Sequence, residues 1–159
     1  CSWMRQFVIV ASLQDVSGAL ERLLGLLRRR TLPVERLSLY QAEENVLEVV
    51  LRFGDLDTPK DRVVAEVASL FDVLSVRCPD PEACDETREL AVVKTCGDLE
   101  PWPETLSDVL QRHDADSIEL SGTPHAIDRA LAYLQEQGVI TGVSRSGEMF
   151  PPHPHEIDT

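Results

Sequence analysis

Residues 13–20, Leu-Gln-Asp-Val-Ser-Gly-Ala-Leu, are the stretch whose residue types and spacing are best suited to chemistry. Asp15 supplies a carboxylate, and Gly18 lets a neighbouring group come close to the backbone. An apolar stripe at helical spacing follows, so the first amides of that helix should point outward without acceptors. Such a helix start attracts a carboxylate or a phosphate. Because an amino acid has a carboxylate for these amides and an ammonium group for Asp15, the stretch predicts a ligand site.

The same stretch also has a purely structural interpretation. A β-branched apolar run over residues 6–12 predicts a buried strand, and leucines at helical spacing follow as far as Arg28. A strand that turns tightly into a helix commonly uses glycine for its backbone alone. The residues by themselves leave both interpretations open.

Composition excludes several classes of function. The 159 residues carry a formal net charge of −13, which argues against binding to nucleic acid or to an anionic membrane. No run approaches the roughly 18 apolar residues of a membrane span. The four cysteines lack the paired short spacings of a zinc site, and no His, Cys or carboxylate cluster predicts a metal site. We therefore expect a cytoplasmic protein with reduced thiols.

The elements around the stretch follow a recognisable order. Apolar runs predict strands over residues 33–42, 46–53 and 72–77, and Thr58-Pro59 predicts a capped helix start with Phe71 on the buried face of the helix. This order is β-α-β-β-α-β, the split βαβ arrangement.

The second half of the chain repeats part of this order. We predict strands over residues 89–95, 117–121 and 139–144, a helix over residues 103–113 and a second helix from Thr123-Pro124. Only three residues separate His113 from Ser117, which predicts that this half lacks one strand. The expected fold is α+β, with two tandem ferredoxin-like domains at residues 5–78 and 88–147, a linker at 79–87 and a flexible tail at 148–159.

Several motifs together resemble a known family. Residues 15–20 and 22–26, Glu35-Arg36-Leu37-Ser38, the stretch 88–94, Leu120-Ser121-Gly122-Thr123 and the closing Val-Ser-Arg-Ser-Gly at 143–147 carry the resemblance. In this order and spacing they resemble the small regulatory subunits of acetolactate synthase (acetohydroxyacid synthase), which are tandem ACT-domain proteins. The resemblance covers about residues 5–147.

This resemblance implies a non-catalytic subunit that needs no cofactor of its own. In that family the first ACT domains pair across a homodimer, and a branched-chain amino acid, usually valine, binds between the turn of one domain and the paired strand of the other. The small subunit controls a thiamine-dependent catalytic large subunit. Carried over by position, the effector-binding residues are Asp15, Val16, Ser17, Gly18, Ala19, Pro33 and Val34.

Two of these positions depart from the family pattern. The family usually has Asn where this chain has Asp15, although an Asp also holds an ammonium group. It has a second ligand-contacting Asn where this chain has Pro33, and proline offers neither a side-chain amide nor a backbone donor. The departure at Pro33 predicts effector binding that is weaker, altered or lost.

Two other functions are compatible with the residues. One is a free-standing or degenerate ACT sensor with a different partner, and the other is a small enzyme on a ferredoxin-like fold, since a fold alone does not give a function. No convincing acid–base, nucleophile or metal constellation supports an enzyme. Trp102, between Pro101 and Pro103, either lies at an interface or covers the end of the second core.

Overall fold

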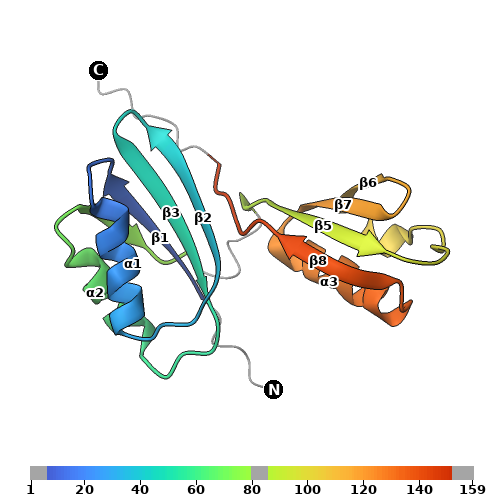
Figure 1. The fold of residues 1–159 in the computed structure, drawn as a ribbon, viewed down its shortest axis with the longest axis horizontal. Helices are drawn as coiled ribbons and strands as arrows, with labels where there is room; N and C mark the ends of the chain where they lie inside the picture. Colours follow the sequence, from blue (N-terminus) through green and yellow to red (C-terminus); the bar gives the residue numbers. More distant parts are fainter. Residues whose placement is uncertain (1–6, 80–85, 152–159) are drawn as a thin grey trace.

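The computed structural model describes residues 7–79 and 86–151. They form two α+β units side by side, the first blue to green and the second yellow to red (Figure 1). Most of the predicted linker and the last eight residues of the predicted tail lie outside the described residues. No helix within the two described ranges is long and apolar enough to cross a membrane.

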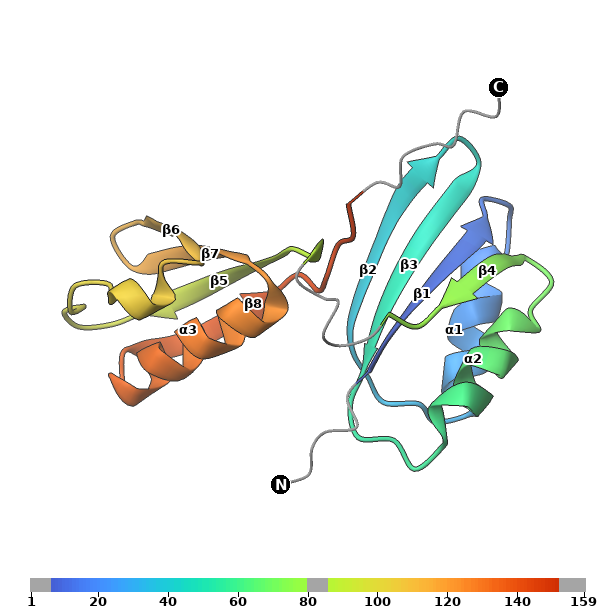
Figure 2. The same cartoon turned by 180° about the vertical axis from the view of Figure 1, so that it is seen from behind.

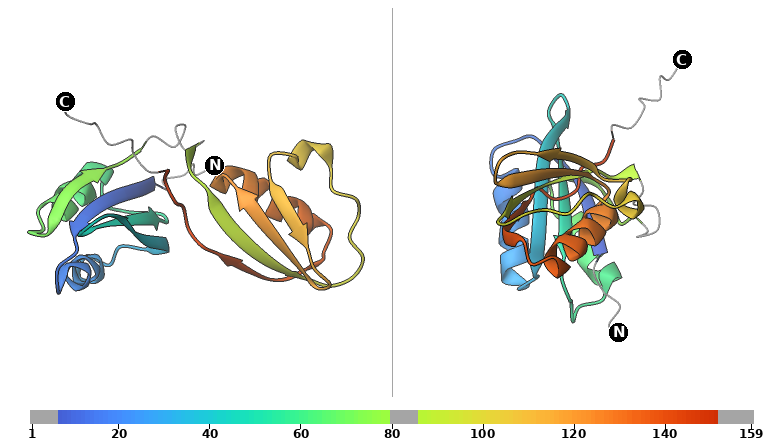
Figure 3. Two further views of the ribbon diagram at one scale, coloured as in Figure 1. Left: turned by 90° about the horizontal axis from the view of Figure 1, so that it is seen from above. Right: turned by 90° about the vertical axis from the view of Figure 1, so that its right-hand side faces the viewer.

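The first unit has the predicted β-α-β-β-α-β order. Its elements are β1 (Phe7–Gln14), α1 (Ala19–Arg29), β2 (Val34–Glu43), β3 (Val46–Phe53), α2 (Lys60–Ala68) and β4 (Val73–Arg77). The antiparallel sheet has the strand order β2-β3-β1-β4. Both helices cover one face of this sheet, the face turned away from the second unit (Figures 2 and 3). The predicted ferredoxin-like fold is thereby confirmed for this half of the chain.

The first core lies between this sheet and its two helices. Alternate residues of β1 and β3 point toward the helices, because successive side chains of a strand face opposite sides. They include Ile9, Leu13 and Leu51, which are fully buried against Leu23 of α1 and Val63 of α2. The continuous apolar run of β1 has a second cause: its other residues are buried on the opposite, outer face of the sheet.

The second unit is built around a sheet of strand order β6-β7-β5-β8. Its elements are β5 (Glu89–Thr95), a short 3₁₀ helix (Glu104–Leu106), β6 (Leu110–His113), β7 (Ser117–Gly122), α3 (Pro124–Glu136) and β8 (Ile140–Arg145). The helix α3 packs Ile127, Ala130 and Leu134 onto one face of this sheet. Trp102 is half-buried beside that core, where its ring meets Tyr133 edge to face. Of the two predicted roles for Trp102, the structure favours covering the core.

Two predictions for the second unit are wrong. Residues 103–113 do not form one helix, and the second sheet does not lack a strand, since it has four. The three residues between His113 and Ser117 are themselves a hairpin turn, in which the Asp114 amide donates to the Ser117 carbonyl at 2.9 Å. The unit has instead replaced the first helix of the fold by a 3₁₀ turn.

Two predictions at the helix α2 are also wrong. Pro59, and not Thr58, stands at the cap position, and no side chain caps this helix. Phe71 is 91 % exposed, because the helix ends at Ala68 and Leu70 turns toward the core in its place. At the equivalent start of α3, the Thr123 hydroxyl accepts a hydrogen bond from the Ala126 amide at 3.1 Å, as predicted.

The segment after β8 crosses back to the first unit (Figure 1). Gly147 lies beside Arg36, Leu37 and Ser38 of β2. Phe150 is buried on the outer face of the first sheet with Val8, Val10 and Val50. Glu148 and Phe150 are therefore buried, although they fall in the expected flexible tail, whereas Met149 and Pro151 between and after them are exposed. Apolar contact and backbone hydrogen bonds between Met149 and Arg88 hold them in place.

Buried charges join the same two units. The carboxylates of Glu89 and Glu148 are fully buried and pair with Arg145 and Arg52 respectively. Arg36 of β2 approaches the second oxygen of Glu89 at 3.7 Å, so cations of the first sheet face carboxylates from the second half of the chain. Burial and the neighbouring Arg145 lower the pKa of Arg36, whereas for Arg145 hydrogen bonds with Glu89 and Asp128 outweigh burial and raise its pKa.

Candidate functional site

The turn between β1 and α1 is fixed by two neighbouring segments. The Gln14 amide donates to the Asp72 carbonyl at 2.9 Å, and the Asp15 amide donates to the Asn45 carbonyl at 2.8 Å. Gly18 then adopts the left-handed conformation, with φ of 87°, and the helix begins at the next residue. An L side chain strains this conformation, so the predicted need for glycine here has a definite backbone cause.

A guanidinium group lies over this turn. Arg22, one helical turn beyond Gly18, donates from Nε to the buried Asp72 carboxylate at 2.5 Å and from Nη2 to the Ser17 carbonyl at 3.3 Å. A Cβ atom at Gly18 would lie 2.5 Å from Arg22 Nη1. The hydrogen bond with Asp72 is the main cause that raises the pKa of Arg22. The absence of a side chain at Gly18 therefore makes room for a cation.

The predicted residues of the turn differ in their exposure. Asp15, Val16 and Ser17 are exposed, and within the described part of the chain the Asp15 carboxylate has no hydrogen-bond or ion-pair partner. The amides of Ser17 and Gly18 likewise have no acceptor among these residues. Ala19 is buried in the core and anchors the helix start. The turn thus presents one free carboxylate, two unpaired amides and one cation.

The other two predicted residues lie at the opposite end of the sheet. Val34 pairs with Phe53, which in turn pairs with Phe7 at the start of β1, whereas the turn follows the last residue of β1. Eight strand residues separate these ends, about 25 Å. Pro33 is exposed and uses its carbonyl to accept a hydrogen bond from Gly54. Within one chain, Pro33 and Val34 therefore do not meet the turn.

The strand β2 is an open edge of the first sheet. It pairs only with β3 among the described residues, and two register shifts interrupt that pairing. Leu37 and Leu39 point toward the helix side but remain partly exposed, because no helix covers this edge. An edge strand with unpaired backbone groups and exposed leucines is suited to pairing with another strand.

Sequence reasoning missed Arg22 and Asp72 as residues of the turn. A helical wheel could have placed Arg22 over the turn, since residues four apart lie on one face of a helix. Asp72 had no comparable signal, because it reaches the turn through the pairing of β4 with β1 across more than fifty residues of chain.

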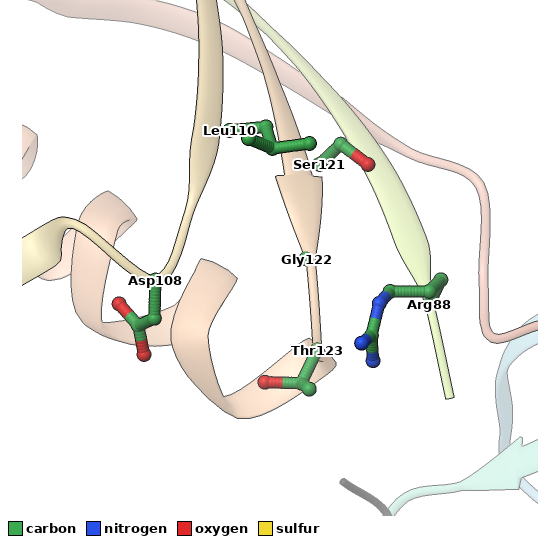
Figure 4. A pocket seen from close by; sticks show the side chains of 6 residues that line it. All are labelled: Arg88, Asp108, Leu110, Ser121, Gly122 and Thr123. Carbon is green, nitrogen blue, oxygen red and sulfur yellow. The ribbon is translucent and has the colours of Figure 1, made fainter. Parts of the chain in front are cut away.

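A pocket of about 350 Å³ lies in the second unit, away from every predicted site residue. It is lined by Arg88, Asp108, Leu110, Ser121, Gly122 and Thr123 (Figure 4). Arg88 and Thr123 lie near the start of α3, whereas Leu110 and Ser121 lie on the sheet. The Asp108 carboxylate is already paired with Arg129. The pocket offers an apolar wall and a cation, and no arrangement of an acid, a base and a nucleophile.

No group of three or more metal-ligating side chains occurs within residues 7–79 and 86–151.

Comparisons with known proteins agree with these observations. No protein-family model matches the chain. An acetolactate synthase small subunit from Haemophilus influenzae is 26 % identical over 153 residues, covering 91 % of this chain and 93 % of that protein. A probable acetolactate synthase small subunit from Methanothermobacter thermautotrophicus is 26 % identical over 146 residues, covering 83 % of this chain and 84 % of that one.

A solved structure extends the comparison to the fold. The acetolactate synthase small subunit from Thermotoga maritima superposes with a TM-score of 0.67 over 96 % of this chain and 99 % of its own, at 17 % identity. The agreement covers both units and not the first alone. The resemblance to acetolactate synthase small subunits, predicted from the motifs, is confirmed by relatives that match most of the chain and by the tandem α+β fold that it shares with the Thermotoga maritima structure.

Proposed function

We propose that this chain is a non-catalytic regulatory subunit of acetolactate synthase that acts in the cytoplasm on a catalytic large subunit. The observation that supports this most is the match with named small subunits over nearly the full length of both proteins. The described residues offer a turn with two unpaired amides, an open sheet edge and a pocket without catalytic groups. These features suit a protein that binds an effector and a second copy of itself and that catalyses no reaction.

The open edge at β2 supports a homodimer. If two copies pair β2 with β2 in antiparallel fashion, their sheets continue side by side and Leu37 and Leu39 lose their exposure. The β2 strand begins at the end of the sheet far from the turn and finishes near it, since Glu43 pairs with Val46 and Val46 with Gln14. Antiparallel pairing therefore carries Pro33 and Val34 of one copy toward the turn of the other.

This arrangement defines the effector site of the proposal. Asp15 holds the ammonium group of a branched-chain amino acid, valine in the first instance, while the amides of Ser17 and Gly18 and the guanidinium of Arg22 hold its carboxylate. Val16 of the same copy and Val34 of the second copy face its side chain. Pro33 contributes shape alone, because it has no donor.

Regulation by such a site follows from linkage. An effector that contacts two copies binds one packing of the dimer more tightly than another, and it shifts the populations by that difference. The activity of the catalytic subunit depends on which packing of the dimer it binds. Effector binding therefore reverses activation, although this chain catalyses no reaction.

Calorimetric titration of the purified chain with valine, leucine and isoleucine tests the effector site. We expect saturable binding of at least one amino acid, and its loss in a Gly18→Leu variant, whose side chain would displace Arg22. The matched control is Gly97→Leu, which places the same side chain on another left-handed glycine with open space around it.

Two outcomes would contradict parts of the proposal. Absence of heat with all three amino acids removes the branched-chain effector, and Pro33 is then its physical reason. Equal loss of binding in both glycine variants assigns the effect to general destabilisation and not to the turn.

A further inference from the structure

The edge strand β2 contacts the second half of the chain along its outer face, the face without helices. Three alternate residues of this strand stand on that face and make these contacts: Arg36, Ser38 and Tyr40. Arg36 Nε lies 3.7 Å from Glu89 Oε2, and the Ser38 hydroxyl donates to the Ser146 carbonyl at 3.2 Å. The Tyr40 hydroxyl accepts a hydrogen bond from the Phe150 amide at 3.3 Å.

The part of β2 that makes these contacts is one regular piece of strand. Residues 36–41 pair with β3 in continuous register, and a register shift lies on each side of them. Such irregularities let a strand bend locally, so the piece is set off from both ends of β2. Its alternate residues Leu37 and Leu39 are exposed at the open edge. The same six residues therefore face the second half of the chain on one side and the unpaired sheet edge on the other.

Residues 146–150, which we call the strap, are joined to the second unit by backbone hydrogen bonds. The Ser146 amide donates to the Leu90 carbonyl at 2.9 Å, and Met149 and Arg88 exchange two hydrogen bonds at 2.9 and 3.0 Å. The strap thus continues the pairing at the start of β5, and Figure 2 shows it leaving the second unit toward the first sheet. It belongs by its backbone to the second unit.

The strap meets the first unit through side chains. Phe150 is buried against the valines of the outer face, with the Arg77 guanidinium carbon 4.8 Å from the centroid of its ring. Glu148 is buried and pairs with Arg52 of β3. No backbone-to-backbone hydrogen bond joins the strap to the first unit among the residues that the structure describes. Docking of the strap therefore depends on the side chains of the first sheet being in place, including those of its edge strand.

We infer that the strap couples the pairing of β2 with a second copy to the position of the second unit. Docking of the strap requires residues 36–41 in regular strand geometry, and pairing of the edge with another strand holds the same residues in that geometry. Each event therefore strengthens the other by the same factor. The inference rests on the homodimer of the proposed function, and it adds that the assembled edge holds the second unit in place.

Sedimentation equilibrium of the full chain tests this coupling, because the dimer dissociation constant must respond to the strap. Phe150→Ala removes the buried ring without touching the β2 edge. We expect it to raise the dimer dissociation constant about fivefold or more, the usual range for coupled sites. The matched control is Met149→Ala, a truncation of the neighbouring side chain, which is 56 % exposed, and it should leave the dissociation constant unchanged.

A second variant keeps the test available if Phe150→Ala does not fold. A Cβ atom at Gly147, where φ is 84°, would lie 2.7 Å from Ser38 Oγ. Gly147→Ala should therefore displace the strap from β2 and raise the dimer dissociation constant as well. Its control is Gly138→Ala, which has a similar backbone conformation, with φ of 70°, and no neighbouring atom within 4 Å.

The possible outcomes separate this inference from the proposed function. If the unaltered chain stays monomeric, or if Leu39→Asp at the open edge leaves the dimer unchanged, the homodimer through β2 and this inference both fall. If the chain dimerises through β2 and both strap variants dimerise as tightly as the unaltered chain or more tightly, the inference alone is overturned, and the strap only covers the valines. Equal weakening in the control variants assigns the effect to general destabilisation, which also overturns it.

Discussion

Gly18 has two reasons to be glycine, its left-handed backbone and the guanidinium above it. We expect Gly18→Ala to destabilise the chain by about 1–2 kcal/mol from the backbone alone, and by more because its Cβ must push Arg22 from Asp72. Gly97→Ala has a similar φ of 82° and open space, so it reports the backbone cost by itself. Urea unfolding measures both.

An Arg22→Met background distinguishes the two causes. There the extra cost of Gly18→Ala should vanish, while the cost of Gly97→Ala should stay the same. If the Gly18→Ala cost does not change in that background, Arg22 plays no part in the requirement for glycine.

The turn could be predicted from sequence because its determinants are local. A strand, a glycine and an apolar helix stripe follow one another between Phe7 and Arg29, and the structure has them in that order. The buried partner Asp72 and the distance between the turn and Pro33 could not be predicted, because both depend on strand order. The effector assignment of these residues stays a prediction.

At the scale of elements, two helices with the same Thr-Pro start differ in their caps. The Thr123 hydroxyl caps α3, whereas no side chain caps α2 after Thr58. We therefore expect Thr123→Ala to lower the free energy of unfolding by about 1 kcal/mol, and Thr58→Ala by no more than a few tenths. Urea unfolding followed by far-UV circular dichroism measures both, and equal losses would contradict a specific cap at Thr123.

The pairing of β6 with β7 explains why the helix predicted over residues 103–113 is wrong. Leu106 and Val109 are three residues apart and both buried, so their spacing suits a helix. Residues 110–113 form a strand because β6 pairs with β7 from Leu110 to His113. All four of these side chains are exposed, so the segment has no alternation of buried apolar and exposed polar residues by which a strand could be predicted from sequence.

For the whole molecule, the junction between the units depends on buried charge. Glu148 is fully buried against Arg52, and its second carboxylate oxygen has no hydrogen-bond partner among the described residues. Arg52→Met leaves this carboxylate unpaired, so we expect a loss of roughly 3–5 kcal/mol in the free energy of unfolding. The double variant Arg52→Met with Glu148→Met should recover most of it, since an apolar pair of similar size removes both charges.

The exposed pair Lys94 and Asp116 provides the control for this double-mutant cycle. Its side chains are about 70 % exposed at a separation of 3.9 Å, so its coupling should stay below about 1 kcal/mol. Additive effects of Arg52→Met and Glu148→Met would show that the two charges do not depend on each other, contrary to the structure.

Because residues 146–150 return to the first unit, the outer face of the first sheet stays uncovered until the end of translation. Val50 leaves the ribosome 100 residues before Phe150, which buries it, and Val8 and Val10 leave still earlier. At roughly 5–20 residues per second, the nascent first unit keeps an open apolar face for about 5–20 s. A newly synthesised first unit is therefore at its most vulnerable to aggregation while the second unit is still being translated, and the final residues to arrive protect the first to fold.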